Sequence, residues 1–432
     1  MSKVVERAVA SQLNEYLVAN DLLPRFQSAY RKGHSTETAM LRVWSDFLMA
    51  ADRRQVTLLS LLDMSAAFDC VDHVILLQRL RYAAGLSDVV LDWIESFLSG
   101  RTQQIAYSGQ LSETQHVLFG VPQGSVLGPL LYILYTAELA HIVARHGLSL
   151  HQYADDLQVY VSTTVDDAAL AADRLVVCLA DMGAWLKASR LRLNPTKTQV
   201  MWLGSQQLLA RLDINDVPVL SSTIQVQQSA RDLGVVIDSR LSLSEQVASV
   251  CRSGYYQLRQ LRQAIRCSSM DATKTMVQAF ITSRLDSCNA LYYGIADELI
   301  RRLQSVQNAA ARLITGTRRC DHITPVLRQL HWLPVRQRVD FKIVTLVHRS
   351  LSGHIPGYLA DDCLLVTDAR ARRLRSADTR TLVVARTQST FGDRTFAASA
   401  PRLWNSLPPD LRQPGLSYGQ FRRSLKTFLF RQ

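Results

Sequence analysis

The sequence predicts an α+β fold, and three observations support that prediction. Segment 56–63 has the length and apolar content of a buried β-strand, and in 152–160 two adjacent aspartates lie between segments that resemble strands. Several longer segments carry apolar residues every three or four positions, which is the pattern of an amphipathic helix packed on a core. In addition, 47% of the 432 residues are hydrophobic, which is enough to fill the cores of two or three domains.

The N-terminal segments lead through two helices to a strand. We expect an amphipathic helix in residues 1–20, a polar loop in 26–36 and a second helix in 37–54. The mostly apolar run VTLLSLLD at 56–63 predicts a buried strand. It ends in Asp63, and a charge at the end of a buried strand needs a physical reason.

Glycines mark the ends of the next helices. Residues 71–85 and 89–100 each end in a glycine, which is favoured after a helix C-terminus. Residues 102–119 are expected to hold two short strands. Residues 120–139 predict a turn rich in glycine and proline that opens a long apolar helix.

The segment 166–189 carries the clearest helical pattern after the strand pair at 152–160. One face is apolar and predicts packing on a sheet; its residues are Ala171, Leu175, Cys178, Leu179, Met182 and Leu186. We expect this helix to stop at Asn194 and Pro195, and strands to follow at 196–204 and 230–238.

From about residue 242 the pattern is helical. The segment 301–316 is the best example, with an apolar stripe of Leu303, Val306, Ala310, Leu313 and Ile314. Near residue 320 arginine and proline become more frequent and the periodicity weakens. Residues 301–432 hold 23 Lys and Arg against 8 Asp and Glu, whereas the formal net charge of the whole chain is +12. This basic surplus suggests a polyanionic partner such as nucleic acid, with a merely arginine-rich soluble surface as the alternative.

The cysteines and the hydropathy pattern argue against several classes of protein. Seven cysteines show no Cys-x-x-Cys pair, so neither a disulfide framework nor a structural zinc site is supported. We expect all seven to be buried thiols in a reducing compartment. The N-terminus lacks the apolar segment of a signal peptide. The longest run without a charged residue, 114–137, is interrupted by Pro122, Gln123, Gly124 and Pro129, so we expect no membrane span.

The stretch QYADDLQVY at 152–160 places two aspartates at the turn of a strand pair. Adjacent carboxylates repel each other, so a turn that keeps both usually offers them a cation. Mg²⁺ prefers oxygen ligands and commonly uses carboxylates together with substrate phosphates. Asp63 is the candidate for a further carboxylate. An ordinary Asp-Asp turn is the alternative.

Five segments, in order, resemble the palm motifs of reverse transcriptases, and most closely those of LINE-type, non-LTR retrotransposons of the jockey-like group. The motifs are LLDMSAAFDCVDH (61–73), GVPQGSVLGPLLYILY (120–135), YADD (153–156), LRLNPTKTQVM (191–201) and RDLGVVID (231–238). FQSAYRKGHSTETAM (26–40) is similar to the fingers signature of the same family. The resemblance implies an RNA-directed DNA polymerase with a right-hand polymerase fold, whose palm is an antiparallel sheet with helices.

The resemblance also implies the metal ligands. Asp63 and Asp155 would hold two Mg²⁺ ions, for which Mn²⁺ is a substitute, and the backbone carbonyl of Met64 would complete one site. Asp156 would support the cluster. One metal would lower the pKa of the primer 3′ hydroxyl, and the other would neutralise the leaving pyrophosphate.

Further roles follow from matching positions, each with a structural alternative. Phe68 matches the steric gate that excludes a ribose 2′ hydroxyl, or else packs in the core. Gln123 and Gly124 would lie against the incoming nucleotide, or else form a turn that starts a helix. Lys197 matches a lysine associated with protonating pyrophosphate, or else is a solvated charge.

Contacts with nucleic acid are expected from basic side chains. Arg31 and Lys32 could meet template phosphates, and Arg252, Arg259 and Arg262 suit a thumb that grips the backbone of a duplex. Solvated charges on a loop and on an ordinary three-helix bundle are the alternatives.

The resemblance divides the chain into partial fingers (1–55), a palm (56–245), a helical thumb (246–318) and a basic C-terminal region of unknown role (319–432). The partners would be an RNA template, a DNA primer and dNTPs, without a membrane. Two alternatives stay open: a truncated copy that only binds nucleic acid, because upstream fingers and endonuclease segments of the family are missing, and a globular protein with a structural cation. The oligomeric state and the compartment stay open, and nuclear action is implied only by the resemblance.

Overall fold

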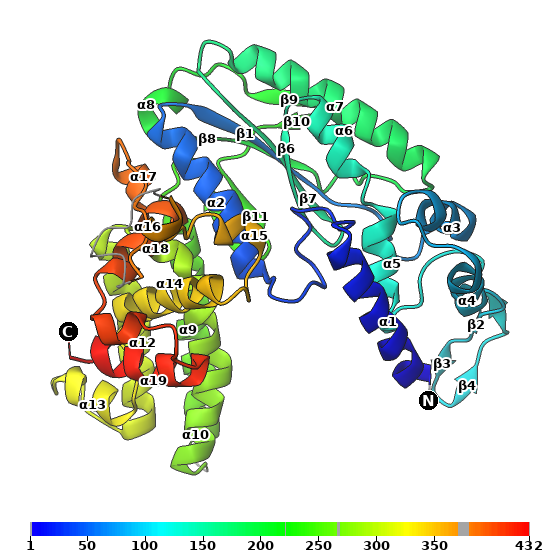
Figure 1. Cartoon of the computed structure of the whole chain (residues 1–432). Helices are drawn as coiled ribbons and strands as arrows, with labels where there is room; N and C mark the ends of the chain where they lie inside the picture. The colour runs from blue at the N-terminus through cyan, green and yellow to red at the C-terminus, as the bar shows by residue number, and fades with distance from the viewer. Residues whose placement is uncertain (1, 221, 266–267, 370–379, 432) are drawn as a thin grey trace.

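The computed structural model describes residues 2–220, 222–265, 268–369 and 380–431 (Figure 1). Its largest sheet has four antiparallel strands in the order β6-β7-β1-β8. The strands are β1 (Val56–Leu62), β6 (Ser149–Tyr153), β7 (Asp156–Thr163) and β8 (Gln199–Leu203). The mixed α/β composition and the antiparallel sheet therefore confirm the coarse fold prediction.

The sheet separates two hydrophobic cores. Successive residues of a strand point to opposite faces. Leu58 of β1 belongs to the core on one side, whereas Leu59 belongs to the core on the other side. Helices cover both faces, so the central strand β1 is buried along nearly its whole length.

The first core contains the helices of the N-terminal half. They are α1 (Ser2–Ala19), α3 (His73–Tyr82), α4 (Asp88–Leu98), α5 (Gly128–Tyr135), α6 (Leu139–Arg145) and α7 (Ala168–Ala188). All six apolar residues predicted to form one face of α7 are buried, and the helix packs on β1 and β7. The same half also holds α8 (Gln206–Leu209) and the ribbon of β9 (Asp216–Val219) and β10 (Ser222–Gln225).

One helix prediction was wrong, and Arg79 contacts the chain where that helix breaks. The long helix expected in 120–139 breaks after Tyr135, whose carbonyl accepts a hydrogen bond from Nη1 of Arg79 at 2.6 Å. α7 covers the helix predicted in 166–189 and ends at Ala188, before the expected stop at Asn194. Ser189, which follows it, is hydrogen-bonded by Arg79 and by the Tyr135 hydroxyl, and Arg190 has a left-handed φ of 57°. These hydrogen bonds come from residues distant in sequence, so the local pattern carries no trace of them.

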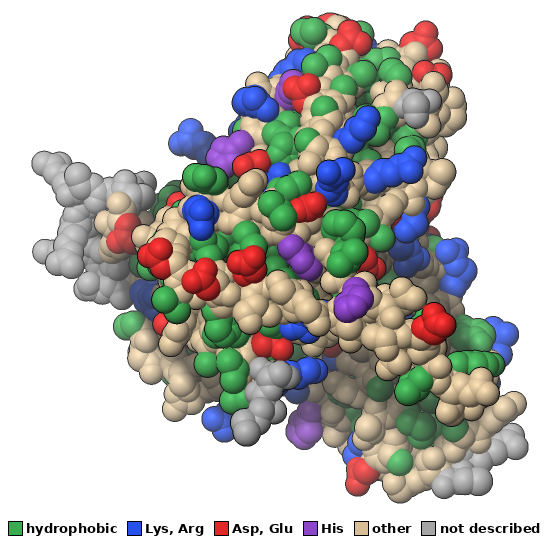
Figure 2. Space-filling view, turned by 90° about the vertical axis from the view of Figure 1, so that its right-hand side faces the viewer, with side chains coloured by type: hydrophobic (Ala, Val, Ile, Leu, Met, Phe, Trp, Pro, Cys, Tyr) green, Lys and Arg blue, Asp and Glu red, His purple; other side chains and the backbone are tan. Residues whose placement is uncertain are grey.

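The strands expected in 102–119 are each interrupted. β2 (Thr102–Gln103) pairs with β5 (Gln115–His116), and β3 (Ala106–Tyr107) pairs with β4 (Gln110–Leu111). Hydrophobic side chains reach the surface on the face of the molecule with this hairpin, α3 and α4, which Figure 2 views directly. They include Tyr82, Val89 and Tyr107, each about 80% exposed.

The second core joins α2, near the N-terminus, to the C-terminal half of the chain. α2 (Thr36–Asp52) packs with the hairpin of β11 (Ser229–Asp232) and β12 (Val235–Asp238), and with the helical second half. The longer helices of that half are α9 (Ser244–Ala264), α10 (Met270–Val277), α12 (Asp297–Thr315), α14 (Val335–Leu351), α18 (Phe396–Asn405) and α19 (Tyr418–Leu429). Shorter segments complete it: η2 (Gln278–Thr282), α11 (Ser283–Asp286), η3 (Asn289–Tyr292), α13 (Ile323–Gln329), α15 (Gly357–Ala360), α16 (Val366–Ala369), α17 (Thr390–Asp393) and η5 (Pro409–Arg412).

The C-terminal helices are bound to α2 by polar contacts as well. The Asp52 carboxylate accepts hydrogen bonds from the amide of Ser389 at 2.6 Å and from its hydroxyl at 2.7 Å. Lys342 forms an ion pair with Glu37 at 2.8 Å. Described residues after 319, such as Val339, Trp404 and Phe421, therefore take part in the second core.

The cysteines differ from the expectation that all are buried. Cys320 is exposed in the loop after α12, and Cys70 is half-buried, whereas Cys178, Cys251, Cys288 and Cys363 are buried. Cys267 lies outside the described residues. Within the described ranges, no helix combines the length and the apolar character needed to cross a membrane.

Candidate active site

Strand register brings the three predicted aspartates to one end of the sheet. Leu62 pairs with Leu157 across β1 and β7, so Asp63, the next residue, lies beside Asp156 at the start of β7. Tyr153 pairs with Asp156, which leaves Ala154 and Asp155 as the two-residue turn between β6 and β7. The turn requires a left-handed residue, and Ala154 supplies it with a φ of 58°.

The three carboxylates influence one another. Burial raises the pKa of Asp155 above its ordinary value, and the charge of Asp63 adds to the shift, although a backbone hydrogen bond lowers it. The pKa of Asp156 is raised by burial, by Asp155 and by Asp63. Lys197 opposes both shifts. The pKa values of Asp155 and Asp156 are therefore raised because burial and the neighbouring carboxylates together outweigh the effect of Lys197.

Lys197 is the nearest cation in the described part of this cluster. Its Nζ lies 3.1 Å from Oδ2 of Asp63, and its side chain is 65% exposed. The Oδ2 atom is buried and has no partner with hydrogen-bond geometry, so the contact is a Coulombic pair only. The backbone of Asp63 is held separately, because its carbonyl accepts from the Asn194 amide at 2.8 Å. Met64 then pairs with Leu193 in an isolated antiparallel bridge.

An open pocket of about 350 Å³ adjoins the aspartates. Its wall includes Asp63, Asp156, Lys197 and Asp232. Asp232 is a fourth carboxylate that the sequence did not single out. Burial, with a smaller contribution from Asp156, raises the pKa of Asp232 to about 7, although Gln158 donates a hydrogen bond to it at 2.7 Å. Asp232 lies in the motif RDLGVVID (231–238), but no role was assigned to it there.

Three aromatic rings lie near Asp155. Phe68 stacks on Tyr132 with ring centroids 4.2 Å apart, and Tyr30 contacts Phe68 edge-on at 6.3 Å. The pKa of Tyr30 and that of Tyr132 are raised by burial and, second, by the charge of Asp155, which places both rings near that carboxylate. Tyr30 is 56% exposed and was missed, although it lies in the predicted fingers signature.

The predicted Gln123–Gly124 turn packs beside the segment that carries Phe68. The amide of Val121 donates to the Phe68 carbonyl at 2.9 Å. Gln123 donates to the Asp69 carboxylate at 2.9 Å and is exposed, and Gly124 has a φ of 77°, which favours glycine.

The predicted basic residues form two groups, and the first is on the loop before α2. Arg31 is half-buried, and its Nη1 donates to the carbonyls of Pro24 and Gln27 at 2.7 and 3.1 Å, so this guanidinium already braces the loop. Lys32 is exposed on the same loop.

A second group of basic side chains lines a groove between α9 and α12. Its volume is about 700 Å³, and its described lining contains Arg259, Arg262, Arg312 and Arg319 but no acidic side chain. Arg252 is exposed on α9 but does not line the groove. The sequence missed Arg312 and Arg319 because they follow α9 by more than 40 residues.

The donor atoms of the aspartates can be compared with those that the metal ions implied by the family resemblance require. Carboxylate oxygens are the preferred donors for Mg²⁺ and Mn²⁺. The orphaned Oδ2 of Asp63 and the raised pKa values of Asp155 and Asp156 are what a cation would relieve. In the side-chain positions described, no three His, Cys, Asp or Glu residues are already close enough to enclose a metal ion. The donor chemistry therefore fits the ions, while Lys197 holds Asp63 in this arrangement.

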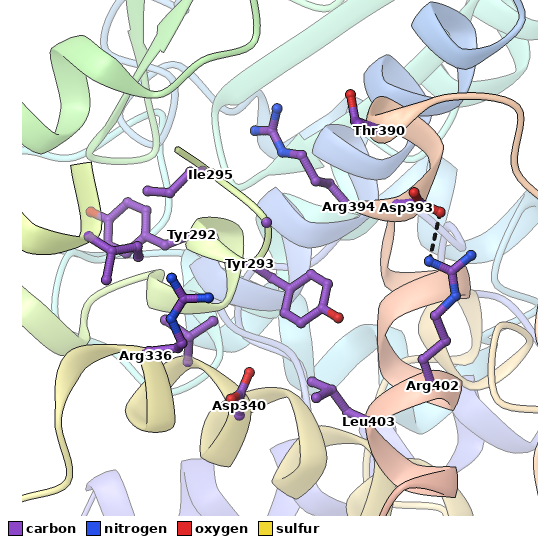
Figure 3. A pocket seen from close by; sticks show the side chains of 13 residues that line it. Tyr292, Tyr293, Ile295, Arg336, Asp340, Thr390, Asp393, Arg394, Arg402 and Leu403 are labelled. Carbon is purple, nitrogen blue, oxygen red and sulfur yellow. Dashed lines mark hydrogen bonds and ion pairs between the residues drawn. The ribbon is translucent and has the colours of Figure 1, made fainter. Parts of the chain in front are cut away.

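The cavity in Figure 3 lies apart from the aspartates, between η3, α14 and the α17–α18 segment. Its volume is about 450 Å³. Arg402 and Asp393 form an ion pair at 2.6 Å on one side, and Asp340 lies on the other (Figure 3). Burial raises the pKa of Asp340 to about 6, with Arg336 opposing the shift.

Comparison with known proteins gives consistent matches. Residues 1–237 match the family model described as reverse transcriptase (RNA-dependent DNA polymerase). The chain is 30% identical over 353 residues to a probable RNA-directed DNA polymerase from transposon BS of Drosophila melanogaster, covering 79% of this chain and 38% of that protein. A probable RNA-directed DNA polymerase from transposon X-element of the same organism is 31% identical over 327 residues, covering 73% and 34%.

A more distant relative is the RNA-directed DNA polymerase from mobile element jockey of Drosophila funebris, which is 26% identical over 73% of this chain and 34% of that protein. The chain thus spans little more than a third of the length of these curated relatives. Among solved structures, telomerase from Candida albicans with a fragment of telomeric RNA covers 83% of this chain and 57% of its own at 14% identity and a TM-score of 0.37. Apo telomerase from Candida tropicalis covers 75% and 51% at 13% identity and a TM-score of 0.40.

Proposed function

This chain belongs to the reverse transcriptase (RNA-dependent DNA polymerase) family, and on that premise we propose that it extends a DNA primer on an RNA template by two-metal nucleotidyl transfer. The proposal concerns the activity of these 432 residues, because the relatives are much longer. The substrates would be dNTPs, and Mg²⁺ would be the ion, with Mn²⁺ able to replace it.

One observation supports the proposal most strongly. Asp63 and the Asp155–Asp156 turn come from separate strands and meet at one end of the sheet, where burial and the charge of Asp63 raise the pKa values of Asp155 and Asp156. A polymerase needs carboxylates that converge in this way, because divalent ions bound there supply charge neutralisation for the reacting phosphates and activate the primer hydroxyl. Asp63, Asp155 and the carbonyl of Met64 would be the ligands, with Asp156 in support.

The side chains of this protein would position the incoming nucleotide and exclude ribonucleotides. Lys197, 3.1 Å from Asp63, would hold a proton on Nζ close to the departing pyrophosphate. Phe68, kept in place by its stacking on Tyr132, would oppose a 2′ hydroxyl on the incoming nucleotide. Gln123 and Gly124 would let the nucleotide approach the backbone closely. Catalysis would then consist mainly of positioning and electrostatics.

The same proposal gives each part of the chain a role. Residues 1–55 would belong to the fingers, 56–245 would be the palm and 246–318 the thumb. The groove of Arg259, Arg262, Arg312 and Arg319 supports a backbone-binding role for the thumb, because such contacts depend on positive charge and not on base sequence. Lys32 and Arg252, both exposed, would add to this charge, whereas Arg31 would act mainly through the loop it braces.

Primer extension tests the proposal. The substrate is poly(rA) with an oligo(dT) primer, dTTP and Mg²⁺, and the chain is compared with Asp155→Ala. Asp173→Ala, an exposed aspartate on α7, is the matched control. Extension that is lost in Asp155→Ala and kept in Asp173→Ala supports the proposal, and extension that is equal in all three overturns it.

A second candidate function is nucleic-acid binding without polymerisation, and the arginine groove favours it as the alternative. If the unmodified chain does not extend the primer, its binding to the same primer–template is measured at several salt concentrations. Affinity that falls steeply with salt supports the binding function, whereas the absence of binding leaves only a globular protein with a structural cation.

A further inference from the structure

Residues 26–29 lie alongside the hairpin that carries the aspartate turn. Gln27 and Gln152 form a parallel bridge. The Ser28 amide donates to the Gln152 carbonyl at 2.9 Å, and the Gln152 amide donates to the Phe26 carbonyl at 2.8 Å. This segment is therefore a short extra strand on the outer edge of β6.

The side chain of Gln27 contacts the turn directly. Its Oε1 accepts hydrogen bonds from the amide of Ala154 at 3.1 Å and from the amide of Ala29 at 2.9 Å. Its Nε2 lies 3.5 Å from the Ala154 carbonyl. Gln27 is 1% exposed and Ala154 is 6% exposed, so water has little access to replace these bonds.

Ala154 needs such a partner for two reasons. Its φ of 58° is left-handed, which a residue with a Cβ adopts only when its surroundings hold it there. Its amide is buried, and a buried donor without an acceptor is unfavourable. Gln27 accepts the hydrogen bond of this amide, and its own Nε2 lies near the carbonyl of the same residue. It therefore contacts both backbone polar groups of Ala154, the residue directly before Asp155.

The C-terminal region supports the same segment from the opposite side. The Ser28 hydroxyl is hydrogen-bonded both to Nε2 of His151 at 2.9 Å and to the hydroxyl of Tyr358 at 2.8 Å. Tyr358 belongs to α15, is 1% exposed and packs edge-on against His151 at 5.4 Å between ring centroids. A residue more than 300 positions away thus fixes the strand that holds the aspartate turn.

We propose that Gln27 is a positioning residue for catalysis, which fixes the backbone of Ala154 and thereby the direction in which Asp155 faces Asp63, and that Tyr358 supports it through Ser28. This inference rests on the proposed polymerase function for its catalytic consequence. Its structural part, the restraint of the turn by Gln27, is independent of that function and can be measured separately.

The test compares Gln27→Met with the unmodified full chain. Methionine has a similar length but offers no amide group. We expect faster amide hydrogen exchange in a peptide covering 150–157, and a kcat for primer extension about 10- to 100-fold lower, because small misplacement of reacting groups has effects of that size. Affinity for primer–template should stay the same. Gln27→Glu keeps an acceptor oxygen, so its exchange in 150–157 and its kcat should both lie between those of Gln27→Met and those of the unmodified chain.

Gln307→Met is the matched control. Gln307 is also 1% exposed, and it donates to the Leu333 carbonyl at 2.9 Å, far from the turn. The variant Gln307→Met should lower the free energy of unfolding but should leave amide exchange in 150–157 unchanged. Unchanged exchange in Gln27→Met, or an equal increase in Gln307→Met, would overturn the inference. If Gln27→Met does not fold, Tyr358→Phe is used in its place, and the same peptide decides.

The two proposals fail in different ways. If the unmodified chain does not extend a primer, the proposed function fails, but the exchange measurement still supports or overturns the restraint by Gln27. If the chain extends a primer and Gln27→Met keeps both its exchange and its kcat, only the positioning role fails.

Discussion

The Nζ of Lys197 lies 3.1 Å from Oδ2 of Asp63, and the same ammonium group lowers the pKa values of Asp155 and Asp156 against the effect of burial. The positive charge of Lys197 therefore acts on all three carboxylates. Because metal ions bind the ionised form of a carboxylate, the charge on Lys197 sets how far the pH can fall before the ligands are protonated.

Replacing Lys197 by methionine should move the acidic limb of the pH–rate profile to higher pH. Without the ammonium group the pKa values of Asp155 and Asp156 rise further, so protonation begins at a higher pH. The profile is measured by primer extension at fixed Mg²⁺. Lys187→Met, an exposed lysine on α7, is the control, and an acidic limb that stays in place would contradict this role for Lys197.

Asp155→Asn should stabilise the metal-free protein while it abolishes extension. The pKa of Asp155 is raised in the folded state, so its charge lowers stability at every pH above that raised pKa, and asparagine removes the charge. The gain at pH 8 in EDTA should be at most about 1 kcal/mol, since the site is partly exposed to solvent. Thermal unfolding with and without Mg²⁺ measures it. A variant less stable than the unmodified chain would refute the expectation.

Phe68→Val should weaken the discrimination against ribonucleotides. A smaller side chain leaves room for a 2′ hydroxyl, so the ratio of kcat/KM for dTTP to that for UTP should fall about tenfold or more. Phe97→Val, a half-buried aromatic on α4, controls for lost packing. If Phe68 only fills the core, both variants lose stability and neither changes the ratio.

Arg259→Gln combined with Arg262→Gln should weaken nucleic-acid binding in a salt-dependent way. Each phosphate contact that is lost lowers the slope of log affinity against log salt by about 0.9 on duplex, so the double variant should lose up to about 2. Titrations at four salt concentrations give the slope. Arg211→Gln removes an exposed arginine paired with Asp166 and should leave the slope as it was.

Asp340→Asn should stabilise the protein at pH 8 and have little effect near pH 4. The folded pKa of Asp340 is about 6, above the unfolded value near 3.9, so its carboxylate begins to lower stability as pH rises through about 4 and has its full effect above 6. The gain at pH 8 should be about 1 to 2 kcal/mol. Urea unfolding at several pH values measures it, and a gain that is the same at all of them would exclude this explanation.

Local patterns predicted the elements whose partners are simple. The apolar face of α7 was correct residue by residue, because this helix lies on the sheet with one face buried. The family resemblance, carried by five short motifs, is confirmed by the match over residues 1–237. The resemblance also made Asp63 the partner of the turn, and the register of β1 and β7 brings them together.

The features that were missed depend on distant partners. Arg79 contacts the chain where two helices end, through partners 56 and 110 residues away, and no local pattern contains such information. Asp232 becomes a wall of the aspartate pocket only because the β11–β12 hairpin folds back against β7. Gln27 was an unremarked polar residue of a loop until the structure placed its amide on Ala154.

The junction of α2 with the last helices also bears on how the protein is made. The Ser45 hydroxyl accepts from the Phe396 amide across 351 residues, and the same core buries Trp44 and Phe47. A ribosome that adds roughly 5 to 20 residues per second needs roughly 20 to 70 s to supply that partner. During this interval the apolar face of α2 emerges without its cover, so newly made chains should depend on a chaperone until the segment around Phe396 has been made.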